Sequence, residues 1–234
     1  MLEKLIETGF GELGIALDGR ALERYRIYFE NLEETNKVMN LTAISGEEDV
    51  ARLHFLDCAA ILGFFPLAGK SLIDVGTGAG FPGLALKVAC PELKLTLLDS
   101  LDKRINFLKD SCAKLGFEDV ACLHARAEEA AADMRESFDF ASSRAVARLN
   151  VLCELCLPFV KCGGCFIAMK STDCALELEE AKNAIGLLGG KLEAVKEYRI
   201  PGTDISHSLI IIRKTRPAGS KYPRRWAQIK KQPL

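Results

Sequence analysis

Hydrophobic positions follow one spacing in the first part of the chain and a different one in the rest. Up to about residue 65 they recur at near-helical intervals, as at Leu22, Tyr25, Phe29 and Leu32, which predicts a helical N-terminal region. From Ser71 onward, short runs of apolar residues alternate with helical patterns. This second spacing predicts strands that alternate with helices.

Seven strands and five helices are predicted after residue 70. The strands are expected over residues 71–75, 93–99, 120–124, 138–142, 164–169, 192–199 and 209–213, and the helices over 82–90, 101–115, 127–135, 149–160 and 175–188. Continuously apolar strands that alternate with helices indicate a buried parallel sheet with right-handed crossovers. The last two strands are joined only by a turn at Pro201-Gly202, so they must pair antiparallel. The α/β pattern therefore predicts a mostly parallel seven-stranded sheet with a C-terminal hairpin, the layout of a Rossmann-like methyltransferase.

Length and composition fit a single compact domain. The chain has 234 residues, of which 49% are hydrophobic and 27% are charged, so it can bury the core of a full α/β domain. We expect a helical N-terminal extension over residues 1–65, the sheet domain over 66–214 and a C-terminal tail over 215–234. The longest nearly apolar stretch, residues 58–69, is shorter than the roughly 20 residues that span a bilayer, and the N-terminus lacks the apolar core of a secretory signal. We therefore expect a cytoplasmic monomer without a membrane partner.

A glycine-rich segment gives the strongest indication of a ligand site. In Leu72-Ile-Asp74-Val-Gly76-Thr-Gly78-Ala-Gly80-Phe-Pro82-Gly83, a buried strand runs into three glycines at alternate positions. Glycine lets the backbone turn sharply and approach a ligand without a Cβ in the way, and proline fits the first turn of the following helix. Asp99 ends the next strand, where its carboxylate can accept hydrogen bonds from ribose hydroxyls.

Three interpretations of this loop are open: a site for the methyl donor S-adenosylmethionine, a dinucleotide site and a turn that binds no ligand. Gly78-Ala-Gly80-Phe-Pro-Gly83 also fits the G-x-G-x-x-G pattern of dinucleotide dehydrogenases, and a glycine-rich turn without a ligand would look similar. Asp74 stands just before the first glycine, where it would repel a pyrophosphate but attract the ammonium of a methionine group. The sheet is also expected to end in a hairpin rather than in a second βαβαβ half. Both features favour S-adenosylmethionine.

Further segments along the chain resemble one family. They are Asn36-Lys-Val-Met-Asn40-Leu-Thr42-Ala, His54-Phe-Leu-Asp57, Asp99-Ser-Leu-Asp-Lys103-Arg104, Arg126-Ala-Glu128, Ser143-Arg144-Ala-Val-Ala-Arg-Leu149 and Lys221-Tyr-Pro-Arg224. With the glycine loop, they make the chain similar, from about Tyr25 to Leu234, to the ribosomal small subunit methyltransferase G family, also called glucose-inhibited division protein B. The tail departs from the family pattern, because Trp226-Ala-Gln stands where a Gly-Thr-Pro run is usual.

The resemblance implies methyl transfer from S-adenosylmethionine to N7 of a guanine in 16S rRNA, with the small ribosomal subunit or its assembly intermediate as partner. Methylation at another RNA position and a cofactor-independent RNA-binding protein on this fold are the alternatives. The expected cofactor contacts are Asp74, Gly76, Gly78, Gly80, Phe81, Asp99, Ser100, Ala127, Glu128 and Arg144. The expected RNA contacts are Asn40, Lys103, Arg104, Arg148, Lys221, Arg224 and Arg225.

The implied reaction needs no general base, because guanine N7 is an unprotonated lone pair. Alignment of N7, the methyl carbon and the sulfur is then the main contribution of the protein. The fourth strand is followed by Ser142-Ser143-Arg144, rather than by the Asn/Asp-Pro-Pro-Tyr/Phe segment that resembling families use to hold an exocyclic amine. Arg144 is therefore the candidate catalytic residue, as a donor to guanine O6 or to a phosphate; a helix-capping or surface arginine is the alternative.

Charge is distributed unevenly along the chain. The net charge is −1, but eight basic residues and no acid follow residue 212, whereas residues 1–212 carry a net charge of −9. Together with Tyr222 and Trp226, this basic tail fits contacts to phosphates and stacking on bases. A tail that is only solvated is the alternative.

Cysteines and histidines offer weaker candidates. Cys153-Glu-Leu-Cys156 and Cys162-Gly-Gly-Cys165 are two C-x-x-C pairs, but only five residues separate them, against about 15–20 in zinc ribbons. Core packing is the simpler interpretation, and we expect no metal. His54 and Asp57 are three residues apart on a predicted helix, so they can share a face, either for helix packing or for contact with the substrate.

Overall fold

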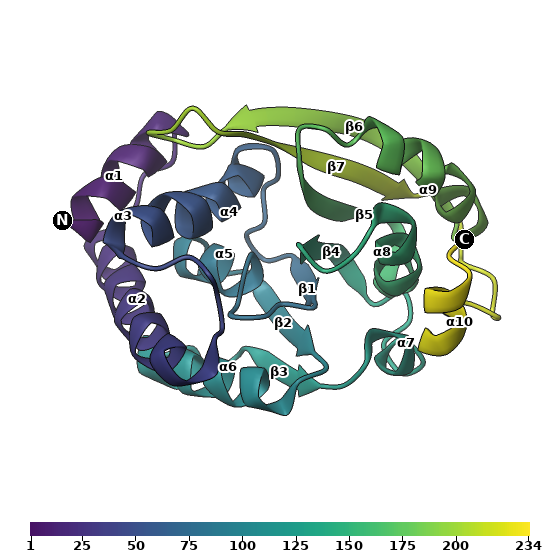
Figure 1. Cartoon of the computed structure of the whole chain (residues 1–234), viewed down its shortest axis with the longest axis horizontal. Helices are drawn as coiled ribbons and strands as arrows, with labels where there is room; N and C mark the ends of the chain where they lie inside the picture. The colour runs from purple at the N-terminus through teal and green to yellow at the C-terminus, as the bar shows by residue number, and fades with distance from the viewer.

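The chain folds around a seven-stranded sheet, and the computed structural model describes all residues 1–234 (Figure 1). The strand order is β3-β2-β1-β4-β5-β7-β6. The strands are β1 (Ser71–Val75), β2 (Lys94–Asp99), β3 (Ala121–His124), β4 (Phe138–Arg144), β5 (Val160–Ser171), β6 (Gly190–Arg199) and β7 (Ser206–Lys214). β7 runs antiparallel to both of its neighbours, β5 and β6, and all other neighbouring strands are parallel. The predicted parallel sheet with a C-terminal hairpin is confirmed.

The strand order reverses between β1 and β4. The chain places β2 and β3 on one side of β1 and then returns to place β4 on the other side. The connections that leave β1 and β4 at their carboxyl ends therefore diverge, and a crevice opens between them. Open α/β sheets of this kind bind their ligands at such a point.

Strands near the hairpin are longer than their apolar runs predict. β5 begins at Val160 and β6 at Gly190, whereas the sequence indicates residues 164 and 192. The ladder between β6 and β7 continues to the pair Gly190 and Lys214. Backbone ladder bonds do not require apolar side chains, so a hydrophobic pattern does not detect polar or glycine residues at the end of a strand.

Helices cover both faces of the sheet. After β1 they are α5 (Gly83–Ala89), α6 (Asp102–Leu115), α7 (Ala127–Ala130), α8 (Leu149–Cys156), α9 (Ala175–Leu187) and α10 (Trp226–Lys231). α7 is a single turn and α8 ends four residues before the predicted boundary, where a 3₁₀ turn with Pro158 follows. No helix is both long and apolar enough to cross a bilayer.

The two faces of the sheet bury separate hydrophobic clusters. Along β7, Leu209 and Ile211 belong to the cluster beneath α5 and α6, whereas Ile210 and Ile212 belong to the cluster beneath α8 and α9. This alternation is the two-residue period of a strand covered on both sides. The sheet is therefore the middle layer of a three-layer α/β/α arrangement.

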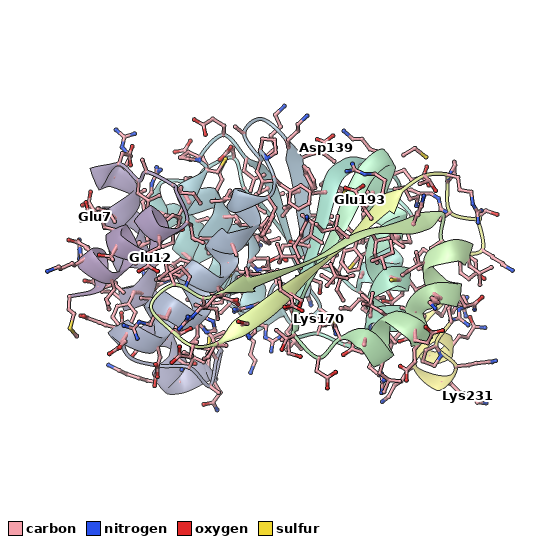
Figure 2. The ribbon with its side chains drawn as sticks, turned by 90° about the horizontal axis from the view of Figure 1, so that it is seen from above. Glu7, Glu12, Asp139, Lys170, Glu193 and Lys231 are labelled. Atoms are coloured by element: carbon pink, nitrogen blue, oxygen red, sulfur yellow. The ribbon has the colours of Figure 1, made fainter.

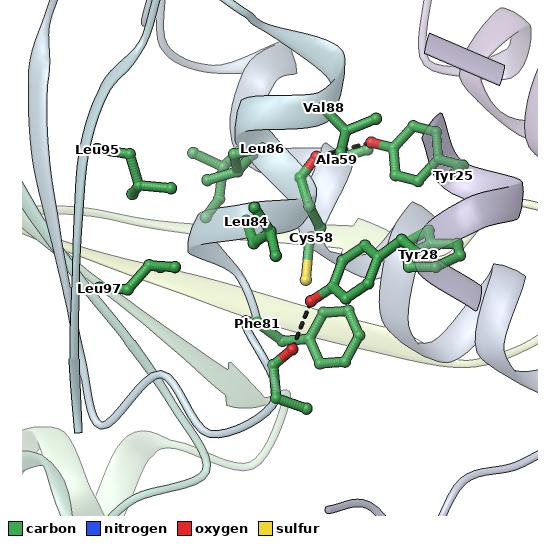
Figure 3. Close-up of a cluster of buried hydrophobic side chains, with 14 of the residues drawn as sticks. Tyr25, Tyr28, Cys58, Ala59, Phe81, Leu84, Leu86, Val88, Leu95 and Leu97 are labelled. Carbon is green, nitrogen blue, oxygen red and sulfur yellow. Dashed lines mark hydrogen bonds between the residues drawn. The ribbon is translucent and has the colours of Figure 1, made fainter. Parts of the chain in front are cut away.

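The N-terminal helices share the first of these clusters. They are α1 (Leu2–Glu12), α2 (Gly19–Met39), α3 (Glu47–Val50), a π-helical segment (Ala51–Leu56), α4 (Asp57–Ala59) and a 3₁₀ turn (Ala60–Gly63). Figure 3 shows two tyrosines of α2 that reach across to the sheet domain. Tyr28 Oη donates to the carbonyl of Ala79 at 2.5 Å, and Tyr25 Oη donates to that of Ala85 at 2.8 Å. The predicted helical region is confirmed, and it packs directly behind the glycine loop.

The C-terminal tail folds back over α8. Ile229 is completely buried, and Arg224 pairs with Glu154 of α8, whose side chain is also completely buried. The Nε–Oε1 and Nη2–Oε2 distances of this pair are 2.9 and 2.6 Å. An entirely solvated tail is therefore wrong, although five of its basic residues are exposed: Arg216, Lys221, Arg225, Lys230 and Lys231. Figure 2 shows Lys231 pointing away from the body of the molecule.

Candidate active site

A cleft of about 560 Å³ lies at the carboxyl ends of β1, β2 and β4, where the strand order reverses. Its lining comes from six parts of the chain: residues 75–81 without Gly80, residues 98–100 with Arg104 at and after the end of β2, residues 125–128 after β3, residues 144–146 after β4, Leu41 with Thr42 and His54 from the N-terminal region, and Leu155 with Trp226 from α8 and α10. The predicted cofactor residues are gathered here, apart from Asp74 and Gly80.

Three glycines shape the loop after β1. Gly76, Gly78 and Gly80 have φ values of 70°, 61° and 101°, which residues with a side chain rarely adopt. A Cβ at Gly78 would meet no atom within 4 Å, so its missing side chain leaves space in the cleft. A Cβ at Gly80 would lie 2.3 Å from Tyr28 Oη. Gly80 therefore allows α2 to pack against the loop and does not itself face the ligand.

Asp74 lies beneath the loop rather than in the cleft. Its completely buried carboxylate accepts hydrogen bonds from Thr77 Oγ1 at 2.6 Å, from the Gly83 amide at 2.9 Å and from Ser142 Oγ at 2.8 Å. These bonds join both ends of the loop to β4. The structure does not support the predicted contact between Asp74 and the methionine ammonium, because both carboxylate oxygens are turned to protein donors. Asp74 instead positions the loop.

Asp99 holds the loop from the end of β2. Its Oδ2 accepts from the Gly78 amide at 3.0 Å and from Arg104 Nη1 at 3.3 Å, and its Oδ1 accepts from the Leu101 amide at 3.0 Å. Each carboxylate oxygen can accept two hydrogen bonds. Oδ1 therefore keeps an acceptor position for a hydroxyl of a ligand in the cleft, which fits the predicted contact with a ribose.

Arg144 is held at the cleft by residues of the N-terminal region. Nη1 donates to the carbonyl of Leu53 and to Asp57 Oδ2, both at 3.0 Å, and Nη2 bonds His54 Nδ1 at 2.8 Å. The guanidinium also lies over the ring of Phe81, 5.1 Å from its centroid. Three of its five N–H groups are used in these bonds, so two are left for a ligand.

Asp57 connects Arg144 to the C-terminal hairpin. It is 1% exposed, and its Oδ1 accepts from Tyr198 Oη at 2.7 Å and from His207 Nδ1 at 2.8 Å. Burial acts to raise the pKa of Asp57, but the hydrogen bond from His207, the Arg144 charge and the bond from Tyr198 lower it overall. Tyr198 and His207 were missed in the sequence, because 141 and 150 residues separate them from Asp57.

His54 stands between Thr42 and Arg144. Because its Nδ1 accepts from Arg144, we assign the ring hydrogen to Nε2, which donates to Thr42 Oγ1 at 2.9 Å. The ring stacks on Phe81 with 4.2 Å between the centroids. His54 and Asp57 do share a helix face, as their spacing allows, and both contact Arg144 from it.

The environment of His54 makes the fold sensitive to acid. Burial, followed by the Arg144 charge, lowers the pKa of His54 to about 3. In the unfolded state a histidine has a pKa near 6.5. Between pH 6.5 and the pKa in the folded state, His54 is therefore protonated in the unfolded state but not in the folded state. Stability therefore falls as the pH falls through this window. His207 acts in the opposite sense, because the hydrogen bond to Asp57 raises its pKa. Its contribution to the stability of the folded state is complete below pH 6.5 and is lost as the pH rises through the pKa of the folded state.

His54→Asn should remove this acid sensitivity while keeping an acceptor for Arg144. From pH 6.5 to pH 5, the wild-type protein should lose about 1.5 kcal/mol of unfolding free energy that the variant does not lose. Urea unfolding at both pH values measures the difference. The same pH dependence in the two proteins would show that His54 is protonated in the folded state.

Three of the predicted RNA contacts lie in or next to the cleft lining. Arg104 lines the cleft, and Lys103 beside it is exposed. Asn40 is the left-handed C-cap of α2, with φ of 47°, and immediately precedes Leu41 in the cleft lining. Of these predicted RNA contacts, one lines the cleft and the other two are exposed residues adjacent in sequence to lining residues.

Two other predicted RNA contacts are engaged within the fold. Arg148, at the N-terminus of α8, pairs with Glu180 of α9 at 2.5 Å, and Arg224 pairs with buried Glu154. Lys221 and Arg225 remain exposed on the tail.

The C-x-x-C cysteines do not gather at one point. Cys153 and Cys156 are buried residues of α8, Cys165 is buried on β5, and Cys162 is exposed. Burial raises the pKa of both α8 thiols, so they pack as small neutral side chains. No group of three or more His, Cys, Asp or Glu residues is arranged to hold a metal ion.

Sequence comparison places the chain among known proteins. The family model described as rRNA small subunit methyltransferase G matches residues 21–205. The ribosomal RNA small subunit methyltransferase G of Acetivibrio thermocellus is 45% identical over 100% of this chain and 97% of its own length. The protein of the same name from Alkaliphilus metalliredigens is 47% identical over 98% of both chains.

Solved structures share the fold at low identity. YcgJ from Bacillus subtilis superposes with a TM-score of 0.53 at 15% identity, over 71% of this chain and 100% of that one. The precorrin-6y C5,15-methyltransferase of Geobacter metallireducens superposes with a TM-score of 0.52 at 14% identity, over 76% of this chain and 92% of that one. With the match to the family model and the identity along nearly the whole length, the chain belongs to the rRNA small subunit methyltransferase G family.

Proposed function

We propose that this protein transfers a methyl group from S-adenosylmethionine to N7 of a guanine in 16S rRNA. The observation that carries the proposal is the cleft, in which the glycine loop, Asp99 and Arg144 meet at the reversal of the sheet. The relatives at 45% and 47% identity are themselves named as small subunit rRNA methyltransferases. We expect the chain to act as a monomer on the small ribosomal subunit or its assembly intermediate.

The residues of the cleft fit S-adenosylmethionine. Gly78 leaves open space where a side chain would project, and Asp99 Oδ1 keeps an acceptor position for a ribose hydroxyl. Val75, Phe81 and Leu98 supply apolar lining. When bound, the cofactor supplies a methyl group activated by the positive sulfonium.

The arrangement of Arg144 suits a reaction that needs orientation more than proton transfer. Guanine N7 already carries a free lone pair, so the site requires no base to activate it. Arg144 lines the cleft, is held by Asp57, His54 and the Leu53 carbonyl, and keeps two N–H groups that can donate to guanine O6 or to a phosphate oxygen. A bound purine held in this way has a fixed approach to the methyl group, and such orientation can lower a barrier by several kcal/mol.

Methyl transfer to RNA tests the proposal directly. Small subunits from cells that lack this protein should accept labelled methyl groups from S-adenosylmethionine in its presence, and nuclease digestion with mass spectrometry should find the label as 7-methylguanosine at one position. Fully methylated subunits from wild-type cells are the control and should accept none. A label on an exocyclic amine, on a ribose or on another base would contradict N7 transfer.

Four exposed basic residues in the last part of the tail should contribute to RNA affinity. If Lys221, Arg225, Lys230 and Lys231 each contact a phosphate, their replacement by Gln should lower the salt slope of RNA binding by about 3, at roughly 0.7–0.9 per contact. We expect a fall of about 2 or more, measured by filter binding at several salt concentrations. Arg224 is left in place, because its removal would leave the buried carboxylate of Glu154 without a partner and would destabilise the fold.

Four exposed lysines elsewhere provide a matched control for charge. They are Lys94, Lys182, Lys191 and Lys196. Their replacement by Gln should leave the slope nearly unchanged. If both sets lower it equally, the tail attracts RNA only through net charge.

A further inference from the structure

The last helix of the chain brings an aromatic side chain into the cleft. Trp226, the first residue of α10, lines the same cleft as Gly78, Asp99 and Glu128. We propose that Trp226 forms one wall of the pocket for the adenine of S-adenosylmethionine. This inference rests on the proposed function, since it assumes that the cleft binds that cofactor.

The order of the strands determines which end of the cofactor lies toward Trp226. Asp99, the ribose acceptor, ends β2, whereas Arg144, which faces the methyl acceptor, ends β4 on the other side of β1. The reactive end of the cofactor therefore points toward β4. Its adenine must extend from the ribose in the opposite direction, toward the end of β3. Ala127 and Glu128 follow β3 and line that part of the cleft.

Trp226 lies at this same end. α7, which begins at Ala127, and α10, which begins at Trp226, both contact α8, and the two helices appear next to each other in Figure 1. Ala127 and Trp226 also pack against one hydrophobic cluster, to which Leu155 of α8 belongs. Leu155 itself lines the cleft. The indole thus lines this end of the cleft together with Ala127 and Leu155.

Several contacts fix the position of Trp226 in the fold. The Arg135 guanidinium donates to the carbonyls of Tyr222 at 2.7 Å and Ala218 at 2.6 Å. Two residues before the indole, Arg224 forms its paired bonds with Glu154, and Ile229 is buried in the next turn. A wall held in place before the ligand arrives loses little entropy on binding. The tail is therefore part of the cofactor pocket as well as a carrier of positive charge.

The chain contains a single tryptophan, so tryptophan fluorescence reports on this position alone. Titration of the full-length protein with S-adenosylhomocysteine should change the emission saturably, with the Kd that calorimetry gives. Trp226→Ala should weaken the calorimetric affinity about tenfold, as expected for the loss of one base–aromatic contact. Trp226→Phe should stay within about threefold of wild type. Gln228→Ala, at an exposed position of the same helix outside the cleft, is the matched control and should bind like wild type.

The possible outcomes separate the inference from the proposed function. If the wild-type protein binds S-adenosylhomocysteine but its emission does not respond, or if Trp226→Ala binds with wild-type affinity, the inference is wrong. The inference is also wrong if Trp226→Ala weakens binding of a 16S rRNA fragment but not of S-adenosylhomocysteine, because the indole then stacks on RNA bases. If the wild-type protein binds no S-adenosylhomocysteine, the proposed function fails as well. The fluorescence titration needs no substitution, so poor folding of a variant does not remove the test.

Discussion

Gly78→Val is expected to abolish binding of S-adenosylhomocysteine while leaving the protein folded. The branched side chain would enter the cleft at the point where a Cβ meets no protein atom, so it would collide with the ligand and not with the core. The positive φ of 61° costs a β-branched residue about 1–2 kcal/mol, which a domain of ordinary stability tolerates. We expect calorimetry to show at least a hundredfold loss of affinity, and thermal unfolding to remain cooperative.

A second glycine of the same loop provides the contrast. Gly80→Ala places its Cβ against Tyr28 and outside the cleft, so it should lower the melting temperature more than it lowers the affinity of the folded fraction. Gly78→Ala should lie between wild type and Gly78→Val in affinity. Unchanged binding in Gly78→Val would mean that the cofactor does not occupy the space beside this loop.

Arg144→Ala is expected to have the largest effect on the reaction itself. It removes the guanidinium that His54, Asp57 and the Leu53 carbonyl hold at the cleft. Single-turnover methyl transfer should therefore slow by a factor of about 100 or more, as when an oriented hydrogen-bond donor is lost. It also leaves Asp57 buried with only His207 and Tyr198 as partners. The unfolding free energy should fall by about 3 kcal/mol, the usual result of breaking a buried pair, which urea denaturation measures.

Arg144→Lys separates the two effects. A lysine keeps the positive charge beside Asp57, so stability should recover in part. Its point-like ammonium cannot reach Asp57, His54 and the acceptor at once, so transfer should remain slow. If Arg144→Lys restores full activity, the guanidinium has no orienting role and only its charge matters.

Local features of the site were predictable from the sequence because neighbouring residues determine them. Three alternate glycines after a buried strand predicted a loop that approaches a ligand, and the structure gives each of them a positive φ. Asp99 was predicted to face the cleft because it ends the strand next to β1. Both conclusions depend only on residues at or just after the end of a strand, and the sequence shows these residues directly.

Contacts between distant segments were not predictable in the same way. The sequence shows that Asp74 precedes the glycine loop, but not that its carboxylate turns inward to Ser142 of β4. The tail carries an obvious positive charge, yet nothing in its composition indicates that Arg224 meets a buried carboxylate 70 residues away. His207 and Tyr198 join Asp57 only because the hairpin returns beside β5, an arrangement that depends on the whole sheet.

The pair of Glu154 and Arg224 also has a consequence for how the protein is made. Synthesis proceeds from the N-terminus, so Glu154 is incorporated well before the arginine that neutralises it. One edge of the sheet is also completed late, because the edge strand β6 is synthesised before β7, the strand that joins it to β5. A chain that ends between Lys214 and Arg224 would contain every strand, but Glu154 would lack its partner and the cluster beneath α8 would lack the buried Ile229. Incomplete products should therefore unfold readily and be degraded, and only full-length chains should persist in the cell.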